Sequence, residues 1–302
     1  MKGEANKLHL HHLLSCYLAF CVKKPVSIIY LNVLLLLVGC VNFRQRMPAK
    51  ADAVLAFATT AEPAGAYVFR RSSPGDEYLA NLRITYKLDN LVAGKKTDFE
   101  RVQAVCAWVH RQWKHNGSNE PQHYDPVSIL QEAAQGKRFR CVEYGIVLTG
   151  ALSALGIPAR TLGLGTADVE TRKARAGHVL AEAWLADQRK WMLVDGQWDV
   201  IPLLNGVPLN AVELQRALAG HERGLTVASP AGTSAKRYGG WIRPYLFYFD
   251  TSLDGRIGVS RTPGQLFLVP VGAANPARFQ GSEPVKNRQY THSLAAFYAP
   301  PQ

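Results

Sequence analysis

The sequence predicts an α+β fold in which a central buried helix packs on an antiparallel sheet. Apolar residues follow helical spacing over residues 98–113, and they cover most sides of residues 141–155. Short apolar segments with strand character come later, and helices followed by a meander are typical of α+β proteins. There is no internal repeat, and no linker interrupts residues 66–302, so we expect one domain there, with a β-rich extension at its C-terminal end.

The composition excludes several classes of protein. The chain has 302 residues, 47% of them hydrophobic and 19% charged, which excludes a disordered chain. The formal net charge is +12, and it is +9 for residues 41–302 (31 basic minus 22 acidic). This balance favours an acidic substrate or surface. No nucleic-acid partner is expected, because no basic segment is interleaved with aromatic residues and no zinc-finger or helix-turn-helix pattern occurs.

Residues 1–40 are predicted to be a signal peptide. Two lysines precede the apolar stretch 25–39, which is shorter than the roughly 20 residues of a spanning helix. The stretch ends in LVGC, which resembles the lipobox of bacterial lipoproteins and implies that Cys40 carries lipid. Val41 follows instead of aspartate, which implies the periplasmic face of the outer membrane. An uncleaved signal anchor is the alternative, and translation could start near Val22.

The segment after the signal peptide and the first helix have different patterns. Residues 41–65 have no clear period, so we interpret them as a tether with an early packing segment. The helix over 98–113 begins with a capping box, since Thr97 is followed by Glu100. Its apolar stripe contains Cys106, and a cysteine in such a stripe is predicted to be a buried structural thiol.

A short helix is predicted over 126–134, and the central helix follows it. The central segment reads CVEYGIVLTGALSAL and is apolar on most sides, which is typical of a buried helix. Gly156 ends it and Pro158 prevents its continuation. Cys141 therefore lies at the N-terminus of a central buried helix.

Strands are expected after the central helix. A turn at 186–189 joins two of them into a hairpin. The predicted strands cover residues 160–164, 178–185, 190–194, 245–250 and 265–271.

Three residues in this frame carry chemistry: Cys141 opens the helix, His178 opens a strand and Asp195 ends the next strand. A helix N-terminus favours a thiolate, which is the nucleophilic form of cysteine. A histidine would stabilise the thiolate and later protonate a leaving group, and a carboxylate would fix its tautomer. A two-residue hairpin loop places Asp195 opposite Leu180 and a four-residue loop places it opposite Glu182, both on the face of His178. A three-residue loop turns it to the other face.

These residues also carry a family resemblance. The blocks RFRCVEYGIVLTGALSALGIPAR, GHVLAEAWL and KWMLVDG resemble the transglutaminase-like superfamily, whose members have a papain-like cysteine-enzyme core. The resemblance implies a nucleophile at Cys141, a general acid and base at His178 and an orienting carboxylate at Asp195. The sequence departs from the family where Arg140 and Val142 flank the cysteine in place of the usual glycine and aromatic residues. It departs again where glycine follows Asp195.

Neighbouring residues have weaker signals. We expect Glu182 to pair with a basic residue such as Arg160, and Asp199 is the fallback for the carboxylate role. In this family a side chain upstream of the cysteine often completes the oxyanion hole. The sequence leaves three candidates for it: Trp113, His115 and Asn116.

The resemblance implies thiol-dependent acyl transfer or hydrolysis on peptide or protein amides in the bacterial cell envelope. An inactive module that binds a peptide or a partner protein is the alternative, and a scaffold built on the aromatic segment 241–249 is a third hypothesis. The membrane would be reached through the lipid anchor. No cofactor or metal is expected, because no calcium-loop pattern occurs, and neither G-x-S-x-G nor H-E-x-x-H indicates another hydrolase class.

Overall fold

The fold is known from a computed structural model. Contacts divide the chain into two compact units, residues 1–47 and 48–302, and the description below concerns the second. The predicted signal peptide and Cys40 lie outside the described residues. No helix in the described part is long and apolar enough to cross a membrane. The structure describes residues 53–60, 62–63, 66–73, 75–257, 264–282, 284 and 287–301.

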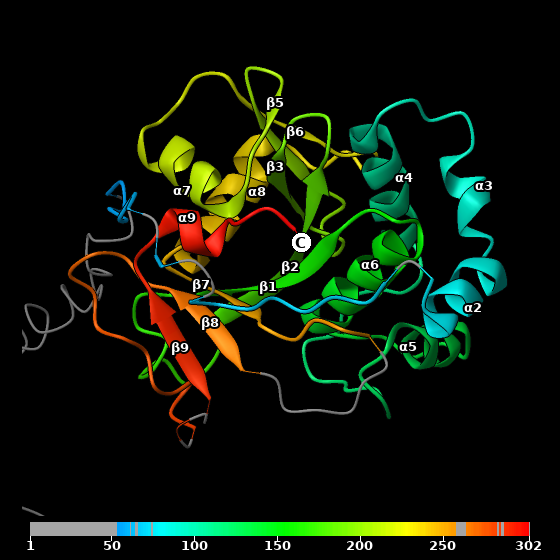
Figure 1. Cartoon of the computed structure of the whole chain (residues 1–302), viewed down its shortest axis with the longest axis horizontal. Helices are drawn as coiled ribbons and strands as arrows, with labels where there is room; N and C mark the ends of the chain where they lie inside the picture. The colour runs from blue at the N-terminus through cyan, green and yellow to red at the C-terminus, as the bar shows by residue number, and fades with distance from the viewer. Residues whose placement is uncertain are drawn as a thin grey trace, which may run out of the picture. The chain divides into compact units, whose positions relative to one another are not determined.

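Helices pack around one central helix, as predicted. Helix α6 contacts α2, α4 and α5, and it lies against β2 and β1 of the large sheet. In Figure 1 these helices gather beside α6, at the right of the view. Their bounds are α2 Glu77–Thr85, α3 Leu88–Val92, α4 Asp98–His110, α5 Pro126–Ala134 and α6 Cys141–Ala154.

The predicted helix starts are confirmed. Both hydrogen bonds of the Thr97–Glu100 capping box are present at α4, which ends three residues before the predicted Trp113. Helix α6 begins at Cys141, where the backbone N–H of Arg140 donates to the carboxylate of Glu143. It ends before Gly156, whose φ of 77° is in the left-handed region that glycine adopts without strain.

A six-stranded sheet has the order β3-β2-β1-β7-β8-β9. Neighbouring strands are antiparallel except β8 and β9, which are parallel, so the expected antiparallel meander is incomplete. The strands are β1 Ala159–Gly165, β2 Gly177–Leu185, β3 Lys190–Val194, β7 Tyr248–Ser252, β8 Gln265–Leu268 and β9 Arg288–Thr291.

Two predicted strands have different bounds. The strand predicted over 245–250 begins at Tyr248, because Arg243–Tyr245 form the 3-10 helix η2. The strand predicted over 265–271 ends at Leu268, two residues before Pro270, which has no N–H to donate to a sheet.

The hairpin of β2 and β3 has one of the registers that the sequence allowed. Leu185 pairs with Lys190 and Ala181 pairs with Val194. This register places Asp195 opposite Leu180, as the two-residue-loop alternative predicted, although the ladder itself ends at Leu185. Asp195 therefore lies on the same sheet face as His178.

A smaller sheet and further helices were not predicted. The helices cover the other face of the large sheet, and the smaller sheet contributes side chains to both hydrophobic cores. One hydrophobic core lies on the α6 side and contains Ala181 and Val194, whereas a second core contains Leu162 and Leu180. The second core also includes side chains of α7, α8 and α9. These elements are β4 Ile201–Leu204, β5 Val207–Pro208, β6 Leu225–Ala228, α7 Ala211–Ala219, α8 Ala235–Ile242 and α9 Leu294–Phe297.

The first described residues pack against the last ones. Ala58 forms a parallel bridge with Ser293, and its N–H donates to the carbonyl of His292 at 2.7 Å. Leu55 and Phe57 are buried in the second core. The described part of the predicted tether, residues 53–60, therefore packs on the domain.

Candidate active site

Cys141 begins α6 one turn before Gly145, where this helix approaches β2 closely. Gly145 makes this approach possible, because a Cβ there would meet the carbonyl oxygen of Leu180 at 3.0 Å and the side chain of Val179 at 3.1 Å. As the first residue of α6, Cys141 also lies at the positive end of the helix dipole. Its thiol is free and partly exposed, so a substrate can reach it.

His178 and Asp195 form a buried pair beside this thiol. Nε2 of His178 lies 2.8 Å from Oδ2 of Asp195, and both side chains are buried. The carboxylate also accepts hydrogen bonds from the backbone N–H groups of Gln197 and Trp198, at 3.0 and 3.2 Å, and from the Tyr238 hydroxyl at 3.0 Å. These donors fix the carboxylate, which in turn orients the imidazole and leaves Nδ1 for the thiol.

The three groups change each other's proton affinity. Burial alone would lower the pKa of His178, but the charge and hydrogen bond of Asp195 outweigh it and raise this pKa to about 9. Burial likewise opposes ionisation of Cys141, but the hydrogen bond and positive charge of His178, with the backbone of Val179, lower the pKa of the thiol. The site therefore favours a thiolate next to an imidazolium.

Helix α8 adds two side chains that the sequence analysis did not assign to the site. Tyr238 donates to Asp195, and the Trp241 ring lies 4.8 Å from the His178 ring in an edge-on arrangement of 83°. Their spacing of three residues places both on one face of α8, and this spacing was the signal that could have identified them. Since Trp241 covers His178 and Leu246–Phe249 are buried, the scaffold hypothesis for residues 241–249 loses its exposed aromatic cluster.

The three oxyanion candidates differ. Trp113 is buried against Tyr144, and its Nε1–H has no acceptor among the described residues. Oδ1 of Asn116 accepts from the backbone N–H of Ser118, so it closes a turn. The pKa of His115 is lowered by burial and by the nearby charge of His178, which indicates that this ring lies near the triad.

The other predicted carboxylates have structural roles. Glu182 forms a buried ion pair with Arg160, in which Nη2 and Oε2 are 2.6 Å apart, as expected. Asp199 is buried and accepts from the backbone N–H of Ala231, and Asp195 is the carboxylate that contacts His178. The described residues contain no group of three or more His, Cys, Asp or Glu that could hold a metal ion.

A cavity of about 350 Å³ opens beside the thiol. Cys141 and His178 line it on one side, and the opposite wall comes from β7, β8, β9 and residues 276–279. Three charged side chains lie in this wall: Asp250, Arg278 and Arg288.

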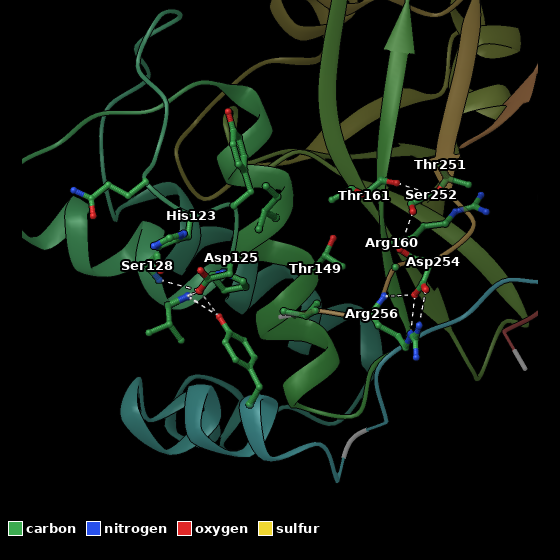
Figure 2. A pocket seen from close by; sticks show the side chains of 18 residues that line it. His123, Asp125, Ser128, Thr149, Arg160, Thr161, Thr251, Ser252, Asp254 and Arg256 are labelled. Atoms are coloured by element: carbon green, nitrogen blue, oxygen red, sulfur yellow. Dashed lines mark hydrogen bonds and ion pairs between the residues drawn. The ribbon is translucent and has the colours of Figure 1, made fainter. Parts of the chain in front are cut away.

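A larger cavity of about 820 Å³ lies between α5, α6 and the end of β7. Its Asp125 accepts from the Tyr78 hydroxyl at 2.5 Å, and Asp254 pairs with Arg256 at 2.6 Å, so its charged groups bind each other or neighbouring residues. It contains none of the three predicted catalytic residues. Figure 2 shows His123, Asp125, Ser128 and Thr149 on its helical side and Thr161, Ser252, Asp254 and Arg256 on its sheet side.

Comparisons with known proteins agree with the resemblance in the sequence. Residues 86–196, which include Cys141, His178 and Asp195, match the family described as the transglutaminase-like superfamily. The helices and antiparallel pairs of the fold also agree with this α+β family. No curated protein sequence matches the chain.

Solved structures that match the chain do so distantly. One is a proposed cysteine protease from Cytophaga hutchinsonii, at 15% identity and a TM-score of 0.32 over 49% of this chain and 47% of that one. Another is Legionella pneumophila LapG, at 14% identity and a TM-score of 0.31, which covers 59% of this chain and 96% of that one. Red sea bream transglutaminase matches at 15% identity and a TM-score of 0.28, over 39% of this chain and 25% of that one. The chain thus spans less than half the length of the first of them.

Proposed function

We propose that this protein is a cysteine-dependent amide hydrolase or acyltransferase with Cys141 as its nucleophile. The observation that carries the proposal is the buried 2.8 Å contact between His178 and Asp195, next to a thiol at a helix N-terminus. The cavity at the thiol supports it, because a substrate needs space on the exposed side of Cys141. The transglutaminase-like match over residues 86–196 agrees with this chemistry.

The reaction takes two steps. The Cys141 thiolate attacks the carbonyl carbon of the amide, and a C–S bond forms as the carbonyl π electrons move to oxygen. The imidazolium of His178 then gives its proton to the amide nitrogen, the C–N bond breaks, and an amine leaves the thioester. In the second step His178 takes a proton from water or from an acceptor amine, which attacks the thioester and releases the thiol. Water gives hydrolysis, and an amine gives cross-linking.

We also propose that the protein is a lipoprotein of the bacterial cell envelope, with Cys40 as the lipidated residue and peptides or proteins as substrates. Only the sequence pattern of residues 1–40 supports this location. The test is metabolic labelling with a fatty-acid analogue in a bacterial host. Label should enter the full chain and be lost in Cys40→Ala, while Cys16→Ala keeps it, and equal labelling of both variants would contradict the proposal.

The test of the reaction is the alkylation rate of the full chain against pH, with the labelled cysteine identified by peptide mapping. Cys141 should react with iodoacetamide well below pH 8.5, the ordinary range of a free thiol. Cys141→Ala should remove this labelling, and His178→Gln should move it to alkaline pH. His292→Gln is the matched control, since that ring contacts the carbonyl of Val269. Labelling that rises only near pH 8.5, or a disulfide between Cys141 and Cys106, would contradict the proposal.

A further inference from the structure

Two oppositely charged side chains of the cavity beside Cys141 have unsatisfied hydrogen-bonding groups. The Asp250 carboxylate accepts no hydrogen bond from any described residue, although a partly buried carboxylate normally has several donors. Arg288 donates from Nη1 to the carbonyl of Pro276 at 2.7 Å, but its Nε–H is buried and has no acceptor among the described residues. Between the two side chains the described structure has no ion pair.

The sheet register places Asp250 near the nucleophile. Gly163 of β1 pairs with Val179 of the neighbouring strand β2, and it pairs with Asp250 of the neighbouring strand β7. Neighbouring strands are about 4.8 Å apart, so Asp250 lies two strands from Val179, the residue after His178. Gly163 brings the carboxylate closer still, because a Cβ at this position would be 2.2 Å from Oδ2 of Asp250. The carboxylate thus lies over β1, and it lines the same cavity as Cys141.

Arg288 reaches the same cavity from the far edge of the sheet. Its guanidinium lies over the Phe267 ring, 4.9 Å from the ring centre. Phe267 is opposite Asp250 in the β7–β8 ladder, and Gln265, two residues earlier, is opposite Arg288 in the β8–β9 ladder. Both charged side chains therefore project from the same face of the sheet. Burial raises the pKa of Asp250 to about 6 and the charge of Arg288 lowers it, so the two groups interact without touching.

The charges of this cavity fit a ligand that carries both signs. Asp250, Arg278 and Arg288 together have a net charge of +1. A lone ammonium group would face two guanidinium groups, and a lone carboxylate would face the unpaired carboxylate of Asp250. A ligand with an ammonium and a carboxylate on one carbon satisfies Asp250 and Arg288 at once.

We propose that Asp250 and Arg288 are specificity-determining residues for a zwitterionic amino-acid head group in the substrate, next to the bond that Cys141 attacks. Asp250 accepts from the ammonium and Arg288 donates to the carboxylate. The inference rests on the proposed function only in that Cys141 is the reacting thiol. It names the substrate class as an amide formed through the side chain of an amino acid, because only such an amide leaves the ammonium and the carboxylate of one α-carbon free.

The test uses small disulfides of matched size as probes of the cavity in the full chain. The Cys141 thiolate attacks one sulfur of the probe, the S–S bond breaks, and the other half leaves as a thiolate, so no further reactant is needed. The probes are cystine (zwitterionic), cystamine (cationic), 3,3′-dithiodipropionate (anionic) and bis(2-hydroxyethyl) disulfide (neutral). Each rate is divided by the rate of the same probe with 2-mercaptoethanol at the same pH, and modification of Cys141 is followed by peptide mapping.

The wild-type chain should prefer cystine over the neutral probe by about tenfold, because two charge-assisted hydrogen bonds form in a partly dry cavity. Asp250→Asn and Arg288→Gln should each reduce this preference below about twofold. The Asp250→Asn variant should then prefer the anionic probe, and the Arg288→Gln variant should prefer the cationic probe. Gly163→Ala should reduce it as well, because the added methyl group displaces the carboxylate. Asp254→Asn and Arg256→Gln, which alter the charged pair of the other cavity, should leave it unchanged.

Two failures are distinguishable. If the neutral probe reacts slowly and His178→Gln does not change its rate, the proposed function fails. If the neutral probe reacts fast in a His178-dependent way but cystine has no advantage, or if its advantage survives both charge-removing substitutions, the assignment of Asp250 and Arg288 is overturned.

Discussion

Cys141 and Cys106 are the two thiols of the described structure, and their properties are opposite. Cys106 is inside helix α4, is buried, and its Sγ lies 3.6 Å from the carbonyl oxygen of Asp195. Burial raises the pKa of this thiol well above its ordinary value, and the carboxylates of Asp199 and Asp195 raise it further. Cys141 begins a helix, is partly exposed and interacts with His178, which lowers its pKa. Position in the helix and the charge of the neighbour, rather than residue type, thus separate a thiol that ionises readily from a thiol of the core.

Asp195→Asn should have the largest effect, because the carboxylate supplies the charge that keeps His178 protonated. The pKa of His178 should fall from about 9 toward its ordinary value, and the Cys141 thiol should lose its imidazolium partner. Alkylation of Cys141 at pH 6 should slow by about 10²-fold. Cys106 should stay unreactive in the folded variant, since its contact is with the backbone carbonyl. An unchanged alkylation rate at Cys141 would contradict the view that the charge of Asp195 makes this thiol more reactive than Cys106.

The pH dependence of stability should separate the two sites. His178 has a folded pKa above its ordinary value of about 6.5, so its contribution is complete below pH 6.5 and is lost as pH rises to about 9. The free energy of unfolding of the wild type, relative to His178→Gln, should fall by about 2 kcal/mol between pH 6 and pH 10. The pKa of Cys106 is also raised, so its contribution is lost only above about pH 8.5, where an unfolded thiol ionises. Denaturant titrations at several pH values measure both contributions. A free-energy advantage of the wild type over His178→Gln that grows with pH would contradict the predicted loss.

Two tyrosines that donate to buried carboxylates provide a matched pair of variants. The Tyr238 hydroxyl donates to Asp195 at 3.0 Å, and the Tyr298 hydroxyl donates to Glu182 at 3.2 Å. Tyr238→Phe and Tyr298→Phe should each lower the free energy of unfolding by about 1–2 kcal/mol, because a buried carboxylate loses a donor. Only Tyr238→Phe should also slow alkylation of Cys141, by about three- to tenfold. An equal change in both variants would mean that Tyr238 does not position the catalytic carboxylate.

Cys106→Ala should have the smallest effect on reactivity. The rate at Cys141 should change less than twofold, because the α4 thiol bonds to the backbone carbonyl of Asp195 and not to the carboxylate that holds His178. The free energy of unfolding should fall by about 1 kcal/mol, since a small buried side chain is lost. Alkylation and denaturant titration on the same preparation measure both, and a slow Cys141 would show that the two thiols are coupled.

The parts of the site that the sequence predicted depend on local patterns. The apolar segment after Cys141, the capping box at Thr97 and the alternation around the 186–189 turn each set a helix start or a register within a few residues. Alternation allowed two hairpin registers with Asp195 on the His178 face and a third with it on the other face, and the fold has one of the first two. The pairing of Glu182 with Arg160 was also predicted, and the structure shows the two opposite each other in neighbouring strands.

The parts that were missed depend on distant contacts. Helix α8 reads AKRYGGWI, and its two glycines weaken any helical prediction, so the three-residue spacing of Tyr238 and Trp241 was not recognised as one helix face. The neighbours of Asp250 come from β1, 87 residues earlier, and from β9, 38 residues later. No local signal fixes such pairings, because they form only when the whole sheet assembles.

The hydrogen bonds of residues 53–58 determine where the domain first resists a mechanical force. If residues 1–52 hold the protein to a membrane, force from that attachment enters the fold at residue 53. It meets first the bonds of Gln215 with Ala53 and Leu55, then the bond from Val271 to Ala56, and then those of Ala58 to His292 and from Leu294. These bonds tie the entry point to α7, to the segment after β8 and to the end of the chain, and none of them involves β1, β2 or β3. They can therefore break under force while the hairpin that aligns His178 with Asp195 stays intact.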